Sequence, residues 1–211
     1  IIIRKTPGDF VVCNLSSLSL AKVIGDNVLK RVIDIQVRML DNVIDLNSID
    51  VPQAVLTNKK YRAIGLGTFG WHHLLAKEGI KWESEEAVIF ADKLYEIINY
   101  YVINASSDLA KEKGEYPAFS GSDWHSGDYF VKRKYDTEEW RNLRERVRSN
   151  GMRNGYLIAV APNSSTSIIA NSTPSVDPIF KKFYSEEKKN YKIPVTAPDL
   201  NTETTWFYKS A

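Results

Sequence analysis

The segment from Ser84 to Lys113 constrains the fold more than any other part of the sequence. Its apolar residues recur with the period of an α-helix and form one face: Val88, Ala91, Leu94, Tyr95, Ile98, Val102, Ala105 and Leu109. Ser84 is a typical N-cap residue, and Gly114 stands where a left-handed residue ends many helices. The segment therefore predicts a long amphipathic helix with one face on a core.

The remaining periodicity predicts an α/β fold that is rich in helix. Further helices are expected over residues 27–45, capped by Asp26 or Asn27, over 71–77, over 137–149 and after Asn201 or Thr202. Strands are expected over residues 1–3, 10–12 and 156–160, the first two joined as a hairpin by a turn over 6–9. Residues 115–130 and 171–200 are expected to be irregular. Strands separated by helices favour parallel pairing.

Composition excludes several classes of protein. Of the 211 residues, 43% are hydrophobic and 26% are charged, which is ordinary for a soluble globular protein. The formal net charge of +2 gives no reason to expect a nucleic acid as partner. No apolar run approaches the roughly 20 residues that a membrane helix needs, so we expect no membrane partner. The single cysteine allows no disulfide within the chain and no cysteine-based zinc site, which favours a reducing compartment, the cytoplasm.

Several motifs resemble catalytic or ligand-binding patterns, but a purely structural role explains them better. Residues 65–70 fit the dinucleotide-binding pattern G-x-G-x-x-G, but only Ala63 and Ile64 precede them as an apolar run. The helix expected after them is followed by another long helix, not by the second strand that the pattern needs. Tight glycine packing at a helix start is the better interpretation. His125 has Asp123 and Asp128 nearby and could act as a base or ligand, although a hydrogen-bonded loop histidine is the more common case.

Two clusters of basic or imidazole side chains offer weak signals. Arg141, Arg144, Arg146 and Arg148 share a helix with interspersed glutamates, which indicates a solvated face with pairing along the helix rather than a nucleic-acid site. His72 and His73 are adjacent, so their side chains diverge by roughly 100° on a helix. No metal site is predicted from them.

Cys13 and a hydroxyl-rich loop are the stronger candidates. Cys13 follows an apolar run, where buried packing is the usual role and redox or nucleophilic chemistry is the alternative. Asn163 to Ser167 lead from a predicted strand into a helix. Free backbone N–H groups at a helix start, together with hydroxyls, can bind phosphate, but ordinary N-capping would also explain such residues. The loop lacks the lysine of a P-loop, so hydrolysis of nucleoside triphosphates is not implied.

Five segments together resemble the large catalytic subunit of class I ribonucleotide reductases. Residues 11–20 (VVCNLSSLSL) resemble the family segment C-N-L-A-S-[IL]-x-L, and residues 161–169 (APNSSTSII) resemble its A-P-T-x-S-T-S-Q-I loop. Residues 171–178 (NSTPSVDP), 38–45 (RMLDNVID) and 62–67 (RAIGLG) look like three further family motifs in the same order. The resemblance covers nearly the whole chain.

The resemblance implies a fold and a place within it. The family fold is a ten-stranded α/β barrel made of two five-stranded halves, and residues 1–211 would be a later section of that barrel, cut at both ends. The N-x-C-x-E signature of the radical cysteine is not present in the sequence. Cys13 would therefore be one member of the redox cysteine pair. The substrate's diphosphate would be held by Pro162, Asn163, Ser164, Ser165 and Thr166.

The resemblance also implies the reaction and its partners. A thiyl radical takes the 3′ hydrogen of a ribonucleoside diphosphate, the 2′ hydroxyl leaves as water, and the cysteine pair supplies two electrons. The chain alone would be inactive and would hold no cofactor. The full enzyme would be a homodimer that works with a metal-containing, radical-generating small subunit and with thioredoxin or a glutaredoxin-type reductant, and nucleotide effectors would bind elsewhere.

Two other hypotheses about function stay open. A non-catalytic phosphate-binding or interaction module, left from an interrupted gene, would explain why the radical cysteine and the partner of Cys13 are not in the sequence. A cobalamin-dependent reductase of the same superfamily would share the cysteine segment but would need no second subunit.

Overall fold

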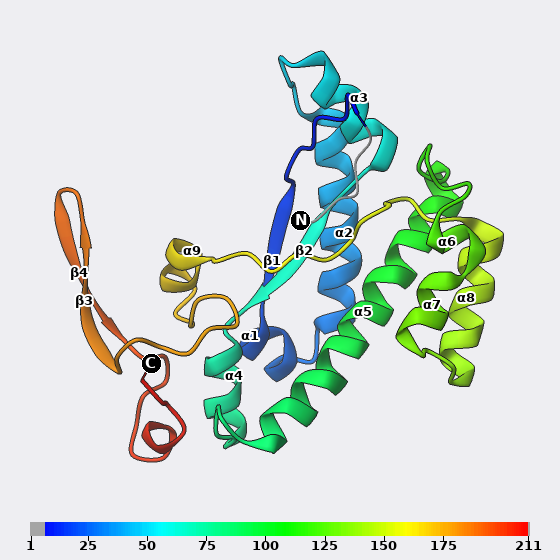
Figure 1. Ribbon diagram of the computed structural model, residues 1–211. Coiled ribbons are helices and arrows are strands. Elements are labelled where there is room, and N and C mark those ends of the chain that lie inside the picture. The colour runs from blue at the N-terminus through cyan, green and yellow to red at the C-terminus, as the bar shows by residue number, and fades with distance from the viewer. Residues whose placement is uncertain (1–6, 211) are drawn as a thin grey trace. The chain divides into compact units, whose positions relative to one another are not determined.

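The computed structural model describes residues 7–210 and divides them into two compact units (Figure 1). Of the described residues, unit 1 comprises 7–16, 30–66 and 96–159, and unit 2 comprises 17–29, 67–95 and 160–210. The expected strand over residues 1–3, the first residue of the expected turn and the last residue of the expected C-terminal helix lie outside the described residues. No helix in the described part of the chain is both long and apolar enough to cross a membrane.

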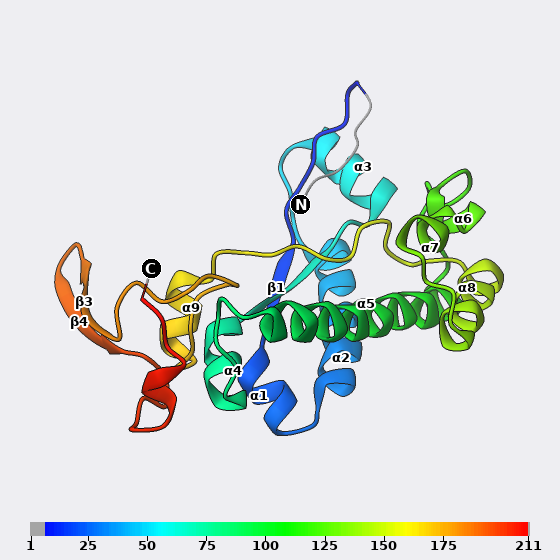
Figure 2. The ribbon, with the colours of Figure 1, turned by 60° about the horizontal axis from the view of Figure 1, so that its bottom comes forward.

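Unit 1 is a helical body. Its elements are α2 (Leu29–Leu46, all but the first residue), α3 (Pro52–Tyr61), the second part of α5 (Glu85–Lys113), α6 (Asp123–Ser126), α7 (Asp128–Arg133) and α8 (Glu138–Asn150). Helices α7 and α8 lie beside the second part of α5 (Figures 1 and 2), where Asn99 Nδ2 donates to Tyr129 Oη at 2.9 Å and Trp140 Nε1 donates to Glu96 at 2.7 Å. Large side chains fill the interior, among them Ile33, Val37, Ile103, Phe130, Leu143 and Met152.

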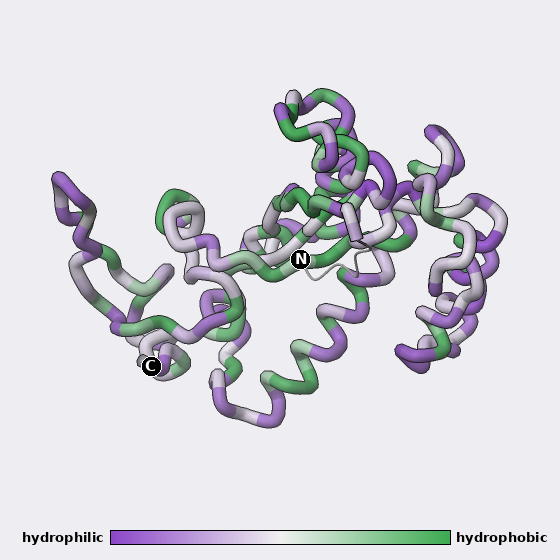
Figure 3. The backbone as a smooth tube through the Cα atoms, turned by 45° about the horizontal axis from the view of Figure 1, so that its top comes forward, coloured by the Kyte–Doolittle hydropathy of each residue, from purple (hydrophilic) through white to green (hydrophobic). Residues whose placement is uncertain are grey.

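Unit 2 combines short helices with a hairpin. Its elements are α1 (Leu20–Gly25), α4 (Trp71–Glu78), the first part of α5, α9 (Ser164–Ile169), β3 (Phe183–Lys188), β4 (Tyr191–Thr196) and the 3-10 helix η1 (Thr204–Trp206). The antiparallel pair β3–β4 ends in a hydrophilic tip (Figure 3). A small core formed by Ala76, Ile179, Ala197 and Tyr208 joins α4 to the C-terminal segment.

The strands β1 (Leu15–Ser19) and β2 (Gly65–Phe69) pair with each other in a two-stranded sheet. Every residue of β2 is buried. Leu66 forms a parallel bridge with Ile158, so the expected strand over 156–160 is present only as an isolated bridge. The α/β, helix-rich prediction is confirmed, whereas the described residues contain no closed sheet.

The long helices follow their sequence signals. Helix α5 begins after Ser84, whose Oγ accepts a hydrogen bond from the backbone N–H of Ala87 at 3.1 Å, and Gly114 follows it with a left-handed φ of 85°. Helices α2, α4 and α8 agree with prediction to within two residues at each end. Near the C-terminus, the expected helix is present only as the 3-10 helix η1, which begins after Glu203 rather than after Asn201 or Thr202, although Asn201 Oδ1 accepts from the backbone N–H groups of Glu203 and Thr204.

Three local predictions were wrong. Residues 10–12 form no strand, because the pairing with β2 begins only at Leu15. The expected loop over 115–130 contains α6 and the first half of α7, and Ser122 Oγ caps α6 by accepting from His125 N at 3.2 Å. The expected irregular stretch over 171–200 contains the β3–β4 hairpin, which accommodates Pro194 in a two-stranded pair.

Candidate functional site

Cys13 lies in an extended segment of unit 1, two residues before β1, and its thiol group is free and its side chain exposed. Its neighbour Asn14 fixes this segment. Asn14 Nδ2 donates to the carbonyl of Leu40 in α2 at 2.7 Å, and Asn14 O accepts from the N–H of Gly65 at 2.9 Å. The usual reading of a lone cysteine as buried packing is therefore wrong here. Because the Cys13 side chain is exposed and hydrogen bonds of Asn14 hold the neighbouring backbone, another thiol can reach Cys13 to form a disulfide.

The hydroxyl-rich loop lies in unit 2 and enters α9 through Asn163, which has a left-handed φ of 51°. The side chains of Ser164, Ser165 and Thr166 are exposed, whereas Ser167 is buried and its Oγ donates to the carbonyl of Ser164 at 2.9 Å. The first backbone bond of the helix runs from Ser167 N to Asn163 O at 2.9 Å. The preceding N–H groups and three hydroxyls are thus presented together.

The two most specific motifs meet at one hydrogen bond within unit 2. Asn163 Nδ2 donates to Ser17 Oγ at 3.1 Å, which joins the loop to the strand that follows Cys13. The other amide atom, Asn163 Oδ1, is buried and has no hydrogen-bond partner among residues 7–210, and neither has the buried Oγ of Ser19. A buried acceptor that no protein group satisfies costs free energy unless water or a ligand donates to it. The surroundings of Asn163 and Ser19 are therefore polar, and the described protein groups do not supply all the hydrogen bonds that these two side chains can form.

The motifs over residues 38–45 and 62–67 meet in a buried ionic network in unit 1. Asp41 is fully buried and accepts from Arg62 Nε at 2.8 Å. The Arg62 guanidinium also forms two bonds to Asp45, at 2.9 and 2.8 Å, which lower the pKa of the Asp45 carboxyl. Because a buried charge is costly unless paired, this network fixes α2 against the segment that leads into β2.

Residues from a distant part of the sequence complete this network, and sequence reasoning missed them. Arg153 Nε contacts both Asp41 oxygens at 3.2 Å, and Asn154 Nδ2 donates to Asp41 Oδ1 at 3.2 Å and to the Arg62 carbonyl at 3.1 Å. The available signal was the pair of aspartates at positions i and i+4, which puts both carboxylates on one helix face. Nothing near Arg153 in the sequence indicates its partners.

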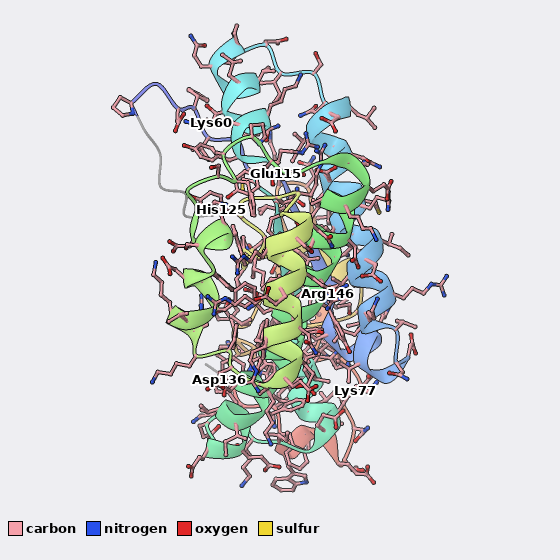
Figure 4. The ribbon with its side chains drawn as sticks, turned by 90° about the vertical axis from the view of Figure 1, so that its right-hand side faces the viewer. Lys60, Lys77, Glu115, His125, Asp136 and Arg146 are labelled. Atoms are coloured by element: carbon pink, nitrogen blue, oxygen red, sulfur yellow. The ribbon has the colours of Figure 1, made fainter. Side chains whose placement is uncertain are left out.

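The remaining candidates have local structural roles. Gly70 precedes α4 with a φ of 81°, and a Cβ there would collide with Ser172 Oγ, so the prediction of tight glycine packing at a helix start is confirmed. His125 lies at the surface in α6 (Figure 4), where its Nδ1 accepts from the N–H of Gly121 at 3.4 Å. Arg146 on α8, in the same view, donates to Tyr100 Oη at 3.2 Å.

His72 and His73 are both buried at the start of α4 in unit 2. His72 Nδ1 accepts from the N–H of Ile179 at 3.1 Å, and His73 Nε2 lies 2.8 Å from Asp199 Oδ2. Burial lowers the pKa of both imidazoles, and in His73 the hydrogen bond to Asp199 opposes this effect. Both side chains are therefore neutral hydrogen-bonding groups at neutral pH. No group of three or more His, Cys, Asp or Glu among residues 7–210 is placed to hold a metal ion.

Acidification should loosen α4. Since the folded-state pKa of each histidine is lowered, the unfolded state binds more protons below about pH 6.5, and the stabilisation present above that pH is lost as the pH falls through the folded-state pKa. We expect hydrogen exchange of residues 71–76 in a full-length protein, corrected for intrinsic rates, to show less protection at pH 5.5 than at 7.5. In a His73→Asn variant this difference should shrink, and equal protection at both pH values in the wild type would contradict the expectation.

Comparison with known proteins finds a match over nearly the whole chain. The family described as "Ribonucleotide reductase, barrel domain" matches residues 1–206. A relative named "Ribonucleoside-diphosphate reductase subunit alpha" from Treponema pallidum is 53% identical over 100% of the chain and 25% of its own length. Proteins of the same name from Helicobacter pylori and Bacillus subtilis are 44% and 32% identical, over 97% and 94% of the chain. The chain spans about a quarter to a third of these relatives.

Proposed function

The chain belongs to the ribonucleotide reductase barrel-domain family, and on that premise we propose that it forms one section of the catalytic subunit of a ribonucleoside-diphosphate reductase. The observation that carries the proposal is the bond between Asn163 and Ser17, because it unites the two most specific motifs of the family resemblance. The whole of residues 1–211 would be part of a ten-stranded barrel, and its two strands β1 and β2 would pair with strands supplied by the rest of that subunit.

In the proposed reaction the chain supplies one electron donor and one binding loop. A thiyl radical outside residues 1–211 removes the 3′ hydrogen of the ribonucleotide, and the 2′ hydroxyl leaves as water. Two thiols then lose two electrons and two protons to form one disulfide: one proton leaves with the 2′ hydroxyl as water, C2′ gains a hydrogen, and the 3′ hydrogen returns to C3′, which restores the thiyl radical. Cys13 is one of these thiols, and its exposure supports both the pairing and the later attack by a reductant thiolate. The product deoxyribonucleotide would serve DNA synthesis.

The substrate's diphosphate would bind to the loop from Pro162 to Thr166. The exposed hydroxyls of Ser164, Ser165 and Thr166 are neutral donors, and the N–H groups at the start of α9 add to them. Helix α9 is short, so the proposal relies on the hydroxyls and on the family motif rather than on a helix dipole. The buried Asn163 Oδ1 needs a donor, which a ribose hydroxyl or a water can supply and an ionised phosphate cannot.

Removing two of these hydroxyls should weaken substrate binding. In a full-length subunit that carries this segment, Ser165→Ala with Thr166→Ala should raise the Kd of a ribonucleoside diphosphate about 10- to 150-fold for each hydrogen bond lost to the charged phosphate. The matched control is Ser120→Ala with Thr202→Ala, which removes two exposed hydroxyls elsewhere. Equal affinity in the loop variant and the wild type, measured by equilibrium binding, would refute the phosphate role.

The proposed partners follow from the same family assignment. They are a radical-generating small subunit, a thioredoxin or glutaredoxin-type reductant, and a second copy of the full-length subunit. Activity that requires cobalamin and no second subunit would instead identify the cobalamin-dependent class. A natural protein that binds phosphate but reduces no ribonucleotide, even with a small subunit and reductant present, would favour the non-catalytic module.

A further inference from the structure

His73 contacts the segment that leaves α9 through both its backbone and its side chain. Its Nδ1 lies 3.1 Å from Ser172 Oγ, and its backbone N–H donates to Thr173 Oγ1 at 3.2 Å. On the opposite side of the ring, Nε2 lies 2.8 Å from Asp199 Oδ2. All of these residues belong to unit 2, and His73, Ser172 and Thr173 are buried.

The network assigns the hydrogens on His73. An ionised carboxylate can only accept, so His73 Nε2 carries the proton and donates to Asp199. In the neutral ring Nδ1 is then an acceptor, and Ser172 Oγ–H donates to it. Burial is the largest influence on the pKa of this ring and lowers it, Lys77 and Lys22 lower it further, and Asp199 alone raises it, so the ring stays neutral. Asp199 thus orients the imidazole toward Ser172.

Ser172 is in turn attached to α9. Its backbone N–H donates to the carbonyl of Ser167 at 2.8 Å, next to the hydroxyl-rich loop. The close approach of this segment to α4 depends on Gly70, because a side-chain carbon there would collide with Ser172 Oγ. Trp71 N adds a longer bond to the carbonyl of Ser175 at 3.4 Å. The start of α4 therefore holds the segment that determines where α9 ends.

Ser172, His73 and Asp199 form a chain of hydrogen bonds in which serine, histidine and aspartate follow one another as in a hydrolytic triad. The burial of Ser172 argues against that chemistry. Ser172 is only 8% exposed, so its Oγ is not available to an acyl or phosphoryl substrate. The same contacts serve well to fix a backbone, since a fully satisfied buried polar network specifies a single arrangement.

We infer that His73 is a positioning residue for the substrate loop: through Ser172 and Thr173 it fixes the end of α9 and thereby the hydroxyls of Ser165 and Thr166. This inference rests on the proposed phosphate role of the loop. His73 itself touches no substrate in this account. Its loss should raise the KM for the ribonucleotide and change kcat little, because only binding of the phosphate depends on the loop.

The test is a steady-state comparison of KM and kcat in the full-length subunit with its small subunit and a dithiol reductant. His73→Phe should raise KM at least about 10-fold, since small displacements of a binding group have effects of that order, with kcat within about twofold of wild type. His73→Asn should restore most of the wild-type KM, because its amide oxygen can occupy the place of Nδ1. His125→Asn, at an exposed histidine, is the matched control and should match wild type.

A second pair of variants separates this inference from the proposed function. Ser165→Ala with Thr166→Ala should raise KM, and adding His73→Phe should raise it little further. If the loop variant raises KM and His73→Phe does not, or if the effects multiply, the His73 inference fails alone. If the loop variant has the wild-type KM, the phosphate role fails. Should His73→Phe not fold, Ser172→Ala must raise KM with kcat retained, and a wild-type KM in that variant overturns the inference.

Discussion

Replacing Cys13 by serine should abolish multiple turnover driven by a dithiol reductant in the full-length subunit. Serine has nearly the same size but cannot form a disulfide, so the two electrons that the reaction needs have no donor at this position. The expected result is product formation at the assay background over the time in which the wild type makes many products. The measurement is the amount of deoxyribonucleotide formed per subunit with excess substrate and reductant.

The matched control for this variant is Met39→Leu, which removes the sulfur of another exposed side chain in unit 1. We expect wild-type turnover from it. Full dithiol-driven activity in the Cys13→Ser variant would remove Cys13 from the redox pair, although it would leave the family assignment unchanged. Loss of substrate binding in the same variant would point to a structural defect, and the binding assay described for the loop detects it.

The largest effect on stability is expected from Asp41→Asn. Asp41 is fully buried and contacts Arg62 and Arg153, so removing its charge leaves these two cations with only the partly exposed Asp45 to compensate them. Breaking such a pair destabilises a protein by about 3–5 kcal/mol. In the full-length subunit, peptides from α2 should then exchange their amide hydrogens about 100- to 4000-fold faster, provided that α2 opens locally.

Asp34→Asn is the control for this prediction because Asp34 lies on the same helix and pairs with Lys30 at the surface, at 2.7 Å. Exposed pairs of this kind contribute about 0.3–0.5 kcal/mol, so the exchange rates should change by less than about threefold. If Asp41→Asn and Asp34→Asn have the same small effect, the ionic network does not hold α2 in place.

The elements that could be predicted from the sequence are those with local signals. Helix α5 carries its own periodicity, its cap at Ser84 and its stop at Gly114. The cap, the stop and the apolar face from Leu94 to Leu109 agree with the structure, whereas Val88, predicted on the same face, is 68% exposed. The strand β2 escaped prediction because it is buried on every residue and contains two glycines, so neither alternation nor β-propensity marks it. The β3–β4 hairpin escaped because Pro194 argues against a strand except at an edge.

The candidate site could be predicted only in part, for a similar reason. The resemblance selected Cys13 and the loop from Pro162 to Thr166 because both are contiguous motifs. The polar contacts around these motifs, by contrast, join residues that lie far apart in the sequence. His73 is separated from Ser172 by 99 residues, and Asp41 from Arg153 by 112. Long-range polar contacts of this kind depend on the folded topology and leave no periodic pattern, so only the structure brings these residues together.

The most direct test of the central claim is a non-reducing peptide map of the natural protein after turnover without reductant. Cys13 is the only cysteine of the sequence, so its redox partner must lie outside residues 1–211. The account predicts that the peptide with Cys13 is linked by a disulfide to such a cysteine, and that the link disappears when a dithiol is added. A free Cys13 thiol after turnover would contradict the role of this chain in reducing ribonucleotides.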